Sequence, residues 1–353
     1  MTKNTLNKNI PSAFYIAVFF IIIAGIMYAS SIVTSVLMAL FISIICAAPI
    51  LWLEKKKVPQ SLAIFIVLIG IVSIFLAFGE LIGTSLSSFT EDAPKYEENL
   101  NTMWNSVLQF FKGKGINFST DKMSNIIDPS KILRVSAGFL GQLGDFMGNA
   151  FTIFFLVLFL LMEMDSIPIK TRAILTDSSN DLAYFNVIGQ RIRHYLSIKT
   201  MTSILTGICI WICLMIIGVD YAIIWALIAF LLNYIPNIGS IIAAVPAVLF
   251  SLIQLGFGGV LWTAGAFVAV NMVVGNVIEP KMMGKGMGLS TFVVFVALIF
   301  WGFVLGTVGM FLSVPLTMAI KIMLEQHPET NWIAIVLGTQ EDAEAILEEK
   351  RKA

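Results

Sequence analysis

The chain has 353 residues, of which 58% are hydrophobic and only 12% charged, and its formal net charge at pH 7 is zero. Soluble globular domains usually carry about 25% charged residues, so this composition excludes a water-soluble protein and indicates an integral membrane protein. The balanced charge gives no reason to expect a nucleic-acid partner.

The first elements expected along the chain are membrane-spanning helices. No charged residue occurs between Lys8 and Glu54, a stretch too long for one span of about 20 residues. It therefore predicts two helices folded as a hairpin that turns near Tyr28–Ser31. The first apolar run lacks a small-residue cleavage site, so it is interpreted as a retained helix and not a signal peptide. The spans expected before residue 220 are 12–29, 31–53, 60–84, 148–165 and 200–218.

The orientation follows from basic residues in short loops, which stay on the cytoplasmic side. Lys55, Lys56 and Lys57 lie between the second and third spans, and Lys170 and Arg172 follow the fourth. Both groups are consistent with one orientation. We therefore expect the N- and C-termini to be cytoplasmic.

These elements divide the chain into five parts. The long segment between the third and fourth spans has mixed charge and helical apolar spacing, which predicts a small extracytoplasmic helical unit. The charged C-terminal residues are expected to form a short solvated cytoplasmic helix. The parts are 1–84 with three transmembrane helices, 85–147 outside, 148–199 with the fourth helix and a cytoplasmic amphipathic helix, 200–325 as the transport core, and 326–353 as the tail.

Residues 231–240, LLNYIPNIGS, interrupt an apolar region. Apolar pieces of about 15 residues lie on each side, and about 22 Å of helix is too short to cross a bilayer comfortably. Pro236 removes a backbone donor and Gly239 supplies conformational freedom. The pattern predicts a re-entrant hairpin with an unwound tip, because irregular backbone at membrane depth must face protein or a water-filled cavity.

A second interrupted segment, 290–325, has the same pattern. Its break contains Gly302, Gly306 and Gly309, and a Val-Pro pair ending at Pro315 follows, as one ending at Pro246 follows the first break. One full span over about 258–278 separates the two segments. Paired interrupted segments are typical of inverted-repeat transporters, with the site between them. The alternative is four ordinary short helices joined by glycine-rich turns. The fold predicted is all-α, with about six full transmembrane helices and two re-entrant hairpins, or seven to eight segments by hydropathy.

Uncharged polar side chains in this region are candidate pathway or solute-binding groups, because amides and hydroxyls can hydrogen-bond a neutral polar solute. The alternative is that they bond neighbouring helices. Glu279 is a candidate proton or cation site, since an intramembrane carboxylate is costly; alternatively it pairs with Lys281 or Lys285. Glu279→Gln is expected to matter strongly only if cations couple to transport. The candidates are Asn233, Pro236, Asn237, Gly239, Ser240, Asn271, Asn276 and Glu279.

Other classes of site find little support in the sequence. The three cysteines and two histidines form no metal-ligand cluster, and no phosphate-binding glycine motif or catalytic cluster is present. We therefore expect no metal, no cofactor and no enzymatic activity. Any transport would be secondary or passive.

The stretches LLNYIPNIGSIIAAVPAVL, VVGNVIEPKMMGKGMGLSTFVVFVALIFWGFVLG and VGMFLSVPLTMAIKIMLE resemble the autoinducer-2 exporter (AI-2E) family of bacterial membrane proteins. The resemblance covers nearly the whole chain, and the PNIGS and EPKxMGxGxGLS motifs are specific. It implies a multi-pass inner-membrane transporter that exports the quorum-sensing signal autoinducer-2 in some members and exchanges sodium or protons in others. It also implies a homo-oligomer, with a pentamer as the candidate assembly. The family motifs include Asn233, Pro236, Asn237, Gly239, Asn276, Glu279, Pro280, Gly284 and Gly288, and Gly306, Gly309 and Pro315 are taken as structural.

Three functions stay open at this point. Export of a small neutral solute such as autoinducer-2 suits the uncharged polar groups. A sodium(lithium)/proton antiporter is the alternative, although between residues 200 and 278 the only carboxylate is Asp220, in a loop. A non-transporting scaffold or channel would explain the outer segment but not the two interrupted hairpins.

Overall fold

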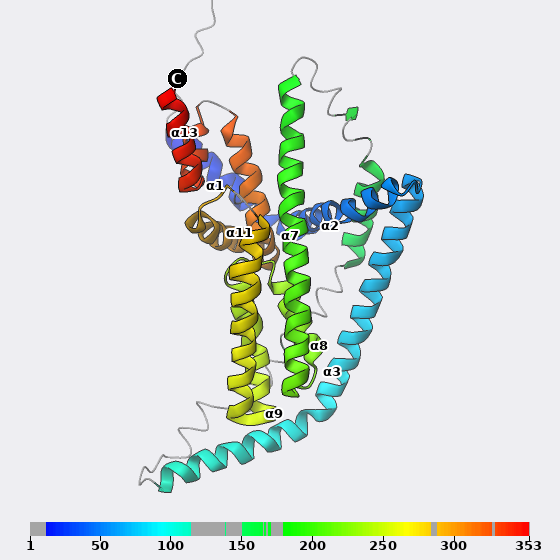
Figure 1. Ribbon diagram of the computed structural model, residues 1–353, viewed down its shortest axis with the longest axis vertical. Helices are drawn as coiled ribbons and strands as arrows, with labels where there is room; N and C mark the ends of the chain where they lie inside the picture. The colour runs from blue at the N-terminus through cyan, green and yellow to red at the C-terminus, as the bar shows by residue number, and fades with distance from the viewer. Residues whose placement is uncertain are drawn as a thin grey trace, which may run out of the picture.

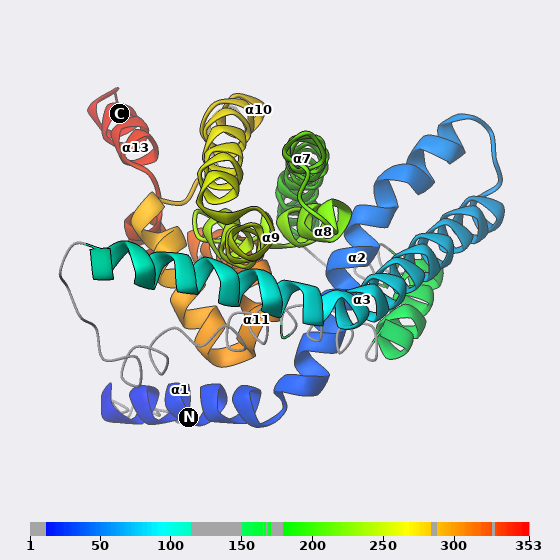
Figure 2. The same ribbon diagram turned by 90° about the horizontal axis from the view of Figure 1, so that it is seen from below.

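The computed structural model describes residues 12–113, 138, 150–164, 166, 169–170, 179–283, 288–326 and 329–352. Every regular element among these residues is a helix, which confirms the all-α prediction. Several helices are long and apolar enough to cross a membrane, and shorter apolar helices accompany them. Figures 1 and 2 show their arrangement.

The N-terminal helices follow the predicted spans. Helix α1 (Ser12–Tyr28) meets α2 (Ser30–Lys55) at Ala29, where the turn was expected, but Figure 2 shows the two helices diverging and not folded back as the expected hairpin. Helix α3 begins at Gln60. A helix over Ala150–Glu163 corresponds to the fourth span. The last three share an apolar core, whose most buried side chains are Ala39, Ile50, Ala63, Val157 and Leu161.

Helix α3 (Gln60–Gly113) continues without interruption across residues 84 and 85, where the third span was predicted to end. Its 54 residues correspond to about 80 Å of helix. Figure 1 shows a bend in α3, and Pro94 inside it is a residue type that bends helices. The expected outer helical unit therefore begins as a continuation of the third span. Its remainder, 114–147, lies outside the described residues except for residue 138.

The outer part of α3 lies across the ends of α8 and α9, as Figure 2 shows from below. Two tyrosine–aspartate hydrogen bonds fasten it: the Tyr96 hydroxyl donates to Asp220 at 3.0 Å, and the Tyr221 hydroxyl donates to Asp92 at 2.8 Å. The Tyr96 ring also packs edge-on against Phe250, with centroids 5.1 Å apart. These contacts cover the end of the first hairpin that lies away from its PNIGS tip.

Helix α7 (Ser179–Ile217) joins two elements that the sequence analysis separated at residue 200. The expected cytoplasmic amphipathic helix and the fifth span form one continuous helix. It packs against α8, α9 and α11, so it borders both interrupted segments.

The predicted break at PNIGS is confirmed. Helix α8 (Ala222–Leu232) ends before it, and α9 (Gly239–Val270) begins after it. The chain reverses between them: a Cβ atom added to Gly239 would lie 1.8 Å from the Leu232 carbonyl oxygen. The 11 residues of α8 correspond to about 16 Å, too short for a full crossing. That the hairpin turns back inside the bilayer stays a prediction from this length.

Helix α9 itself reverses at Gly256, where φ is 69° and ψ is −159°. The Thr263 hydroxyl donates to Ser251 at 3.0 Å, although 12 residues of continuous helix would separate them by about 18 Å. The second arm continues as a π-helix, η1 (Asn271–Ile278), and as α10 (Glu279–Met283). This arm corresponds to the full span expected over 258–278.

Helix α11 (Thr291–Glu325) is also a hairpin, and it turns at Gly306 with φ 67° and ψ −149°. The Trp301 indole N–H donates to Thr317 at 3.1 Å across the two arms, 16 residues apart in sequence. At Gly309 an added Cβ atom would lie 1.9 Å from the Trp301 carbonyl oxygen. Of the predicted structural glycines, Gly306 therefore forms the turn, and Gly309 allows the two arms to approach closely. Two helical arms joined at a glycine fit both the re-entrant hairpin and the alternative of short helices with a glycine-rich turn, so the re-entrant character of this segment stays a prediction.

Helix α13 (Gln340–Lys352) is the short, charged and largely exposed helix expected of the tail, but the tail also contacts the membrane helices. Helices α12 (Asn331–Leu337) and α13 fold back onto α11. Ala334 is buried, the Ser290 N–H donates to the Leu337 carbonyl at 3.1 Å, and Lys321 Nζ lies 3.3 Å from an Asp342 carboxylate oxygen. Asp342 is thus a second carboxylate partner of the buried Lys321 ammonium, beside Glu325 of the same helix at 3.2 Å, and the charge pattern alone did not reveal this contact.

Asp342→Asn is expected to loosen this docking. Burial raises the pKa of Asp342, but the Thr339 N–H and the Lys321 ammonium outweigh it and hold the pKa below its ordinary value. Because this pKa is lowered, the stabilisation that Asp342 gives to the docked tail is fully present at pH values above the ordinary carboxyl pKa. It is lost as the pH falls through the pKa of the folded protein. Because Asp342 is part-exposed, amide hydrogen exchange in α13 should accelerate about twofold to fivefold. Glu348→Gln, on the exposed face of α13, should leave exchange unchanged, and equal rates in both variants would contradict the docking role.

Candidate functional site

A cavity of about 420 Å3 lies where the tip of the first hairpin meets η1, α10 and the start of α11. Seven of the eight side chains predicted as pathway residues line it, and the eighth position, Gly239, lies at the end of the same tip. Leu289, Thr291 and Val294 contribute from the second interrupted segment. The predicted residues in its wall are Asn233, Pro236, Asn237, Ser240, Asn271, Asn276 and Glu279.

The tip of the first hairpin is held in place by hydrogen bonds to α7. The Asn233 amide donates to the Ser203 hydroxyl at 3.0 Å, and the Tyr234 hydroxyl lies 2.9 Å from Thr200 Oγ1. Asn233 is buried, so its amide nitrogen bonds a neighbouring helix, as the alternative interpretation of these asparagines proposed. Asn233 therefore positions the tip and also borders the cavity.

Asn237 has a different environment at the same tip. Its backbone has a positive φ of 61°, a conformation that asparagine adopts more easily than most residues. Its side chain is exposed and lines the cavity, and no hydrogen bond to it is found among the described residues. Its amide is thus available to a solute.

The Tyr234 ring connects the tip to two other parts of the molecule. Its centroid lies 5.6 Å from that of Phe41 on α2 and 6.1 Å from that of Phe311 on the second arm of α11. Aromatic pairs at these distances are favourable beyond their buried area. The two interrupted segments therefore meet at a packed aromatic contact beside the cavity.

The wall opposite the tip is the π-helix η1, which contains Asn271 and Asn276. Pro280 has no N–H to donate to the Asn276 carbonyl four residues earlier, and its ring would clash with that carbonyl in a regular α-helix. The wider turn relieves this conflict. Such π segments occur frequently at functional sites. The sequence analysis missed the π-helix, although the position of Pro280 after two asparagines was an available signal.

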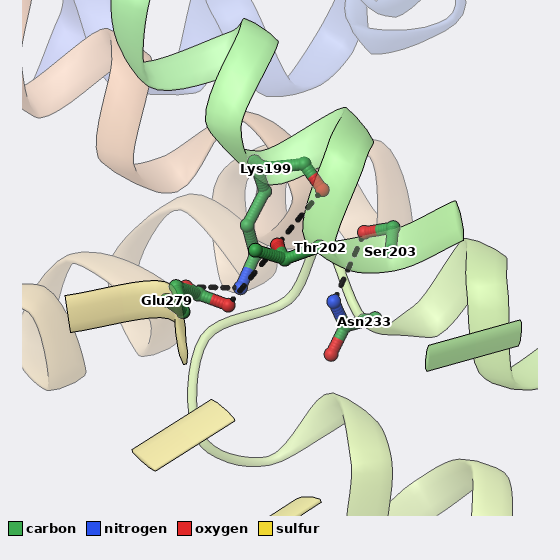
Figure 3. Close-up of polar contacts among 5 residues, drawn as sticks. All are labelled: Lys199, Thr202, Ser203, Asn233 and Glu279. Carbon is green, nitrogen blue, oxygen red and sulfur yellow. Dashed lines mark hydrogen bonds and ion pairs between the residues drawn. The ribbon is translucent and has the colours of Figure 1, made fainter. Parts of the chain in front are cut away.

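A buried ion pair lies in the wall of the cavity, as Figure 3 shows. Lys199 on α7 donates to a Glu279 carboxylate oxygen at 2.6 Å, and the Thr202 hydroxyl lies 3.3 Å from the other oxygen. The Lys199 side chain is 5% exposed and the Glu279 side chain is 15% exposed. Glu279 therefore does not make the expected pair with Lys281; Lys285 lies outside the described residues. The sequence analysis missed Lys199 as a site residue.

The other predicted motif residues lie in different parts of the molecule. Pro280 lines the cavity, whereas Gly288, with φ 66°, lies next to Lys321 Nζ. Pro315 is buried in the second arm of α11, and Gly284 lies outside the described residues. Gly288 thus belongs to the docking region of the tail.

The tail also reaches the candidate site. Thr339, in the link between α12 and α13, forms part of the wall of the cavity. A second cavity of about 460 Å3 lies between α7, α11 and the tail, with Arg191, Lys321 and Asn331 in its wall. No predicted pathway residue lines this second cavity in the described chain. The first cavity is therefore the candidate functional site.

A comparison with known protein families matches residues 15–329 to the AI-2E family of transporters. The chain belongs to the AI-2E family. It is 41% identical over 346 residues to a protein of Haemophilus influenzae, covering 96% of this chain and 99% of the relative. It is 36% identical over 318 residues to the AI-2 transport protein TqsA of Escherichia coli, covering 90% and 92%. It is 24% identical over 287 residues to a sodium-lithium/proton antiporter of Halobacillus andaensis, covering 75% and 79%.

Membership in the AI-2E family confirms the predicted family and the transporter class. The family match, together with several helices long and apolar enough to cross a membrane, also confirms a multi-pass membrane protein. Two of these relatives are named for different solutes, so the family name alone does not choose between them.

Proposed function

We propose that the cavity between the two interrupted segments is the solute site of a secondary transporter that exports autoinducer-2 or a similar small neutral polar solute. The observation that carries this proposal is the chemistry of the cavity wall. Four asparagine amides and three hydroxyls line it beside apolar side chains, and the charged side chains in its described wall, Lys199 and Glu279, neutralise each other. A volume of about 420 Å3 is within the usual range for small-molecule sites.

The name of the Escherichia coli relative supports autoinducer-2 as the solute. Proteoliposomes that contain the purified protein should release or accumulate autoinducer-2 down its gradient faster than protein-free vesicles. Lack of autoinducer-2 flux in vesicles with correctly inserted protein would exclude this solute.

Sodium(lithium)/proton exchange is the second candidate function, favoured by one specific observation. The Glu279 carboxylate lies in the cavity wall, beside unwound backbone of the type that coordinates cations in transporters. The Halobacillus relative carries this activity in its name. A sodium-driven pH change measured in the same vesicles separates the two functions.

Asn237→Gly is expected to reduce autoinducer-2 flux about tenfold or more, because it removes a hydrogen-bonding amide worth ~1.5 kcal/mol. Glycine keeps the positive φ of this position, so the tip should retain its shape. Asn237→Ala should abolish flux, since it adds backbone strain to the same loss.

Asn331→Ala is the matched control, because Asn331 lines the other cavity. Its flux should equal that of the unmodified protein at equal protein per vesicle. Unchanged flux in Asn237→Gly would count against a solute site at the tip.

We also propose a homo-oligomer in the bacterial inner membrane, with a pentamer as the candidate assembly and both termini in the cytoplasm. Native mass spectrometry in detergent tests the subunit number. Accessibility of a cysteine added at the C-terminus tests the orientation.

A further inference from the structure

Lys199 lies where few lysines are found, in the wall of a cavity between membrane helices. Its side chain is only 5% exposed, and α7 places its ammonium 2.6 Å from the Glu279 carboxylate. Burying these two charges is costly unless each has a close partner. Figure 3 shows that both side chains point toward one another from α7 and α10, so the pair is a built feature of the cavity.

We propose that Lys199 determines the charge selectivity of this cavity by acting as a tethered cation at Glu279. It fills the place that a free monovalent cation would occupy, and the cavity then accepts uncharged polar solutes. The inference rests on the proposed function only in placing the transported solute in this cavity.

The surroundings of Glu279 would suit a cation if Lys199 were absent. The Thr202 hydroxyl lies 3.3 Å from the second carboxylate oxygen. Asn271 and Asn276 lie in the same wall, and Pro236 and Asn237 of the unwound tip line the same cavity. Oxygen atoms of these kinds are the ligands of hard cations in proteins and transporters.

The tether gives the lysine an advantage over a dissolved cation. A group attached to the same fold has an effective concentration in the millimolar range or above, and it is already oriented. The ammonium also donates directly to the carboxylate, a charge-assisted hydrogen bond stronger than a neutral one. Dissolved sodium must displace this contact to reach Glu279, so the unmodified cavity should exclude it.

The test is sodium binding to purified, full-length protein, measured with sodium-22. Lys199→Gln removes the tethered cation and keeps polar character; its sodium binding is expected to exceed that of the unmodified protein at least tenfold. Lys199→Arg, which keeps the charge, and the double variant Lys199→Gln/Glu279→Gln, which removes the carboxylate too, should both bind as weakly as the unmodified protein.

Two results would overturn the inference: sodium binding to the unmodified protein as strong as in Lys199→Gln, or no gain in a Lys199→Gln protein that elutes as a single folded species. If Lys199→Gln is not recovered folded, Lys199→Met preserves the apolar length of the side chain and carries the same comparison. Absence of autoinducer-2 flux in the unmodified protein would refute the proposed solute, whereas the sodium comparison would still decide the role of Lys199.

Discussion

Gly239→Ala and Gly309→Ala are each expected to yield little or no folded protein. The added Cβ atom would lie 1.8 Å from the Leu232 carbonyl oxygen in the first case and 1.9 Å from the Trp301 carbonyl oxygen in the second. Both obstacles are backbone atoms, which cannot rotate away as a side chain can. Overpacking of flexible side chains costs about 1–3 kcal/mol, and displacement of a hairpin arm should exceed this range.

Gly258→Ala and Gly265→Ala are the matched controls. Both glycines belong to the second arm of α9, and an added Cβ atom at either meets nothing within 4 Å. We expect these variants to elute from size exclusion in detergent as the unmodified protein does, with the same melting temperature. Recovery of Gly239→Ala or Gly309→Ala with an unchanged melting temperature would contradict the close packing of the hairpin arms.

Glu279→Gln is expected to destabilise the protein by about 3–5 kcal/mol, because it leaves the buried Lys199 ammonium without a carboxylate. This loss should appear as a lower melting temperature in detergent whether or not cations couple to transport. The expectation from sequence, that the substitution matters strongly only with coupling, did not include Lys199 as the partner of Glu279.

Two comparisons make this prediction specific. The double variant Lys199→Met/Glu279→Gln removes both charges and should recover most of the lost stability. Glu163→Gln breaks the exposed pair of Glu163 with Lys170 and should cost no more than about 1 kcal/mol. Equal melting temperatures for Glu279→Gln and the unmodified protein would show that the pair is dispensable.

The two hairpin breaks could be predicted because their causes are local. Pro236 and Gly239 end and restart a helix through their own backbone chemistry, and Gly306 adopts a conformation that is essentially restricted to glycine. A break in an apolar run is visible in one sequence. The close approaches at Gly239 and Gly309 follow from the same hairpins.

The ion pair could not be predicted, because its partners are 80 residues apart and belong to different helices. Charge patterns show which residues are basic, but not how far each helix is rotated about its axis. Lys199 was therefore not predicted as a site residue. The docking of the tail on Lys321 escaped prediction for the same reason, since it depends on contacts between distant segments.

The candidate pathway residues came together because five of them lie at the first break, and the other three lie in η1 and at the start of α10, which border the same cavity. Their individual roles did not follow from this proximity. Asn233 bonds α7, whereas Asn237 faces the cavity, and only the fold separates these environments.

The continuity of α3 has a mechanical consequence. One helix, bent along its length, packs with α2 near its start, through Ala63, and holds the first hairpin farther along, through Tyr96. Moving the hairpin away from α3 requires that the Tyr96–Asp220 hydrogen bond breaks; otherwise α3 must move together with the hairpin. In the second case the part of α3 that packs with α2 would move as well, and the N-terminal helices would then be moving parts of the transport cycle.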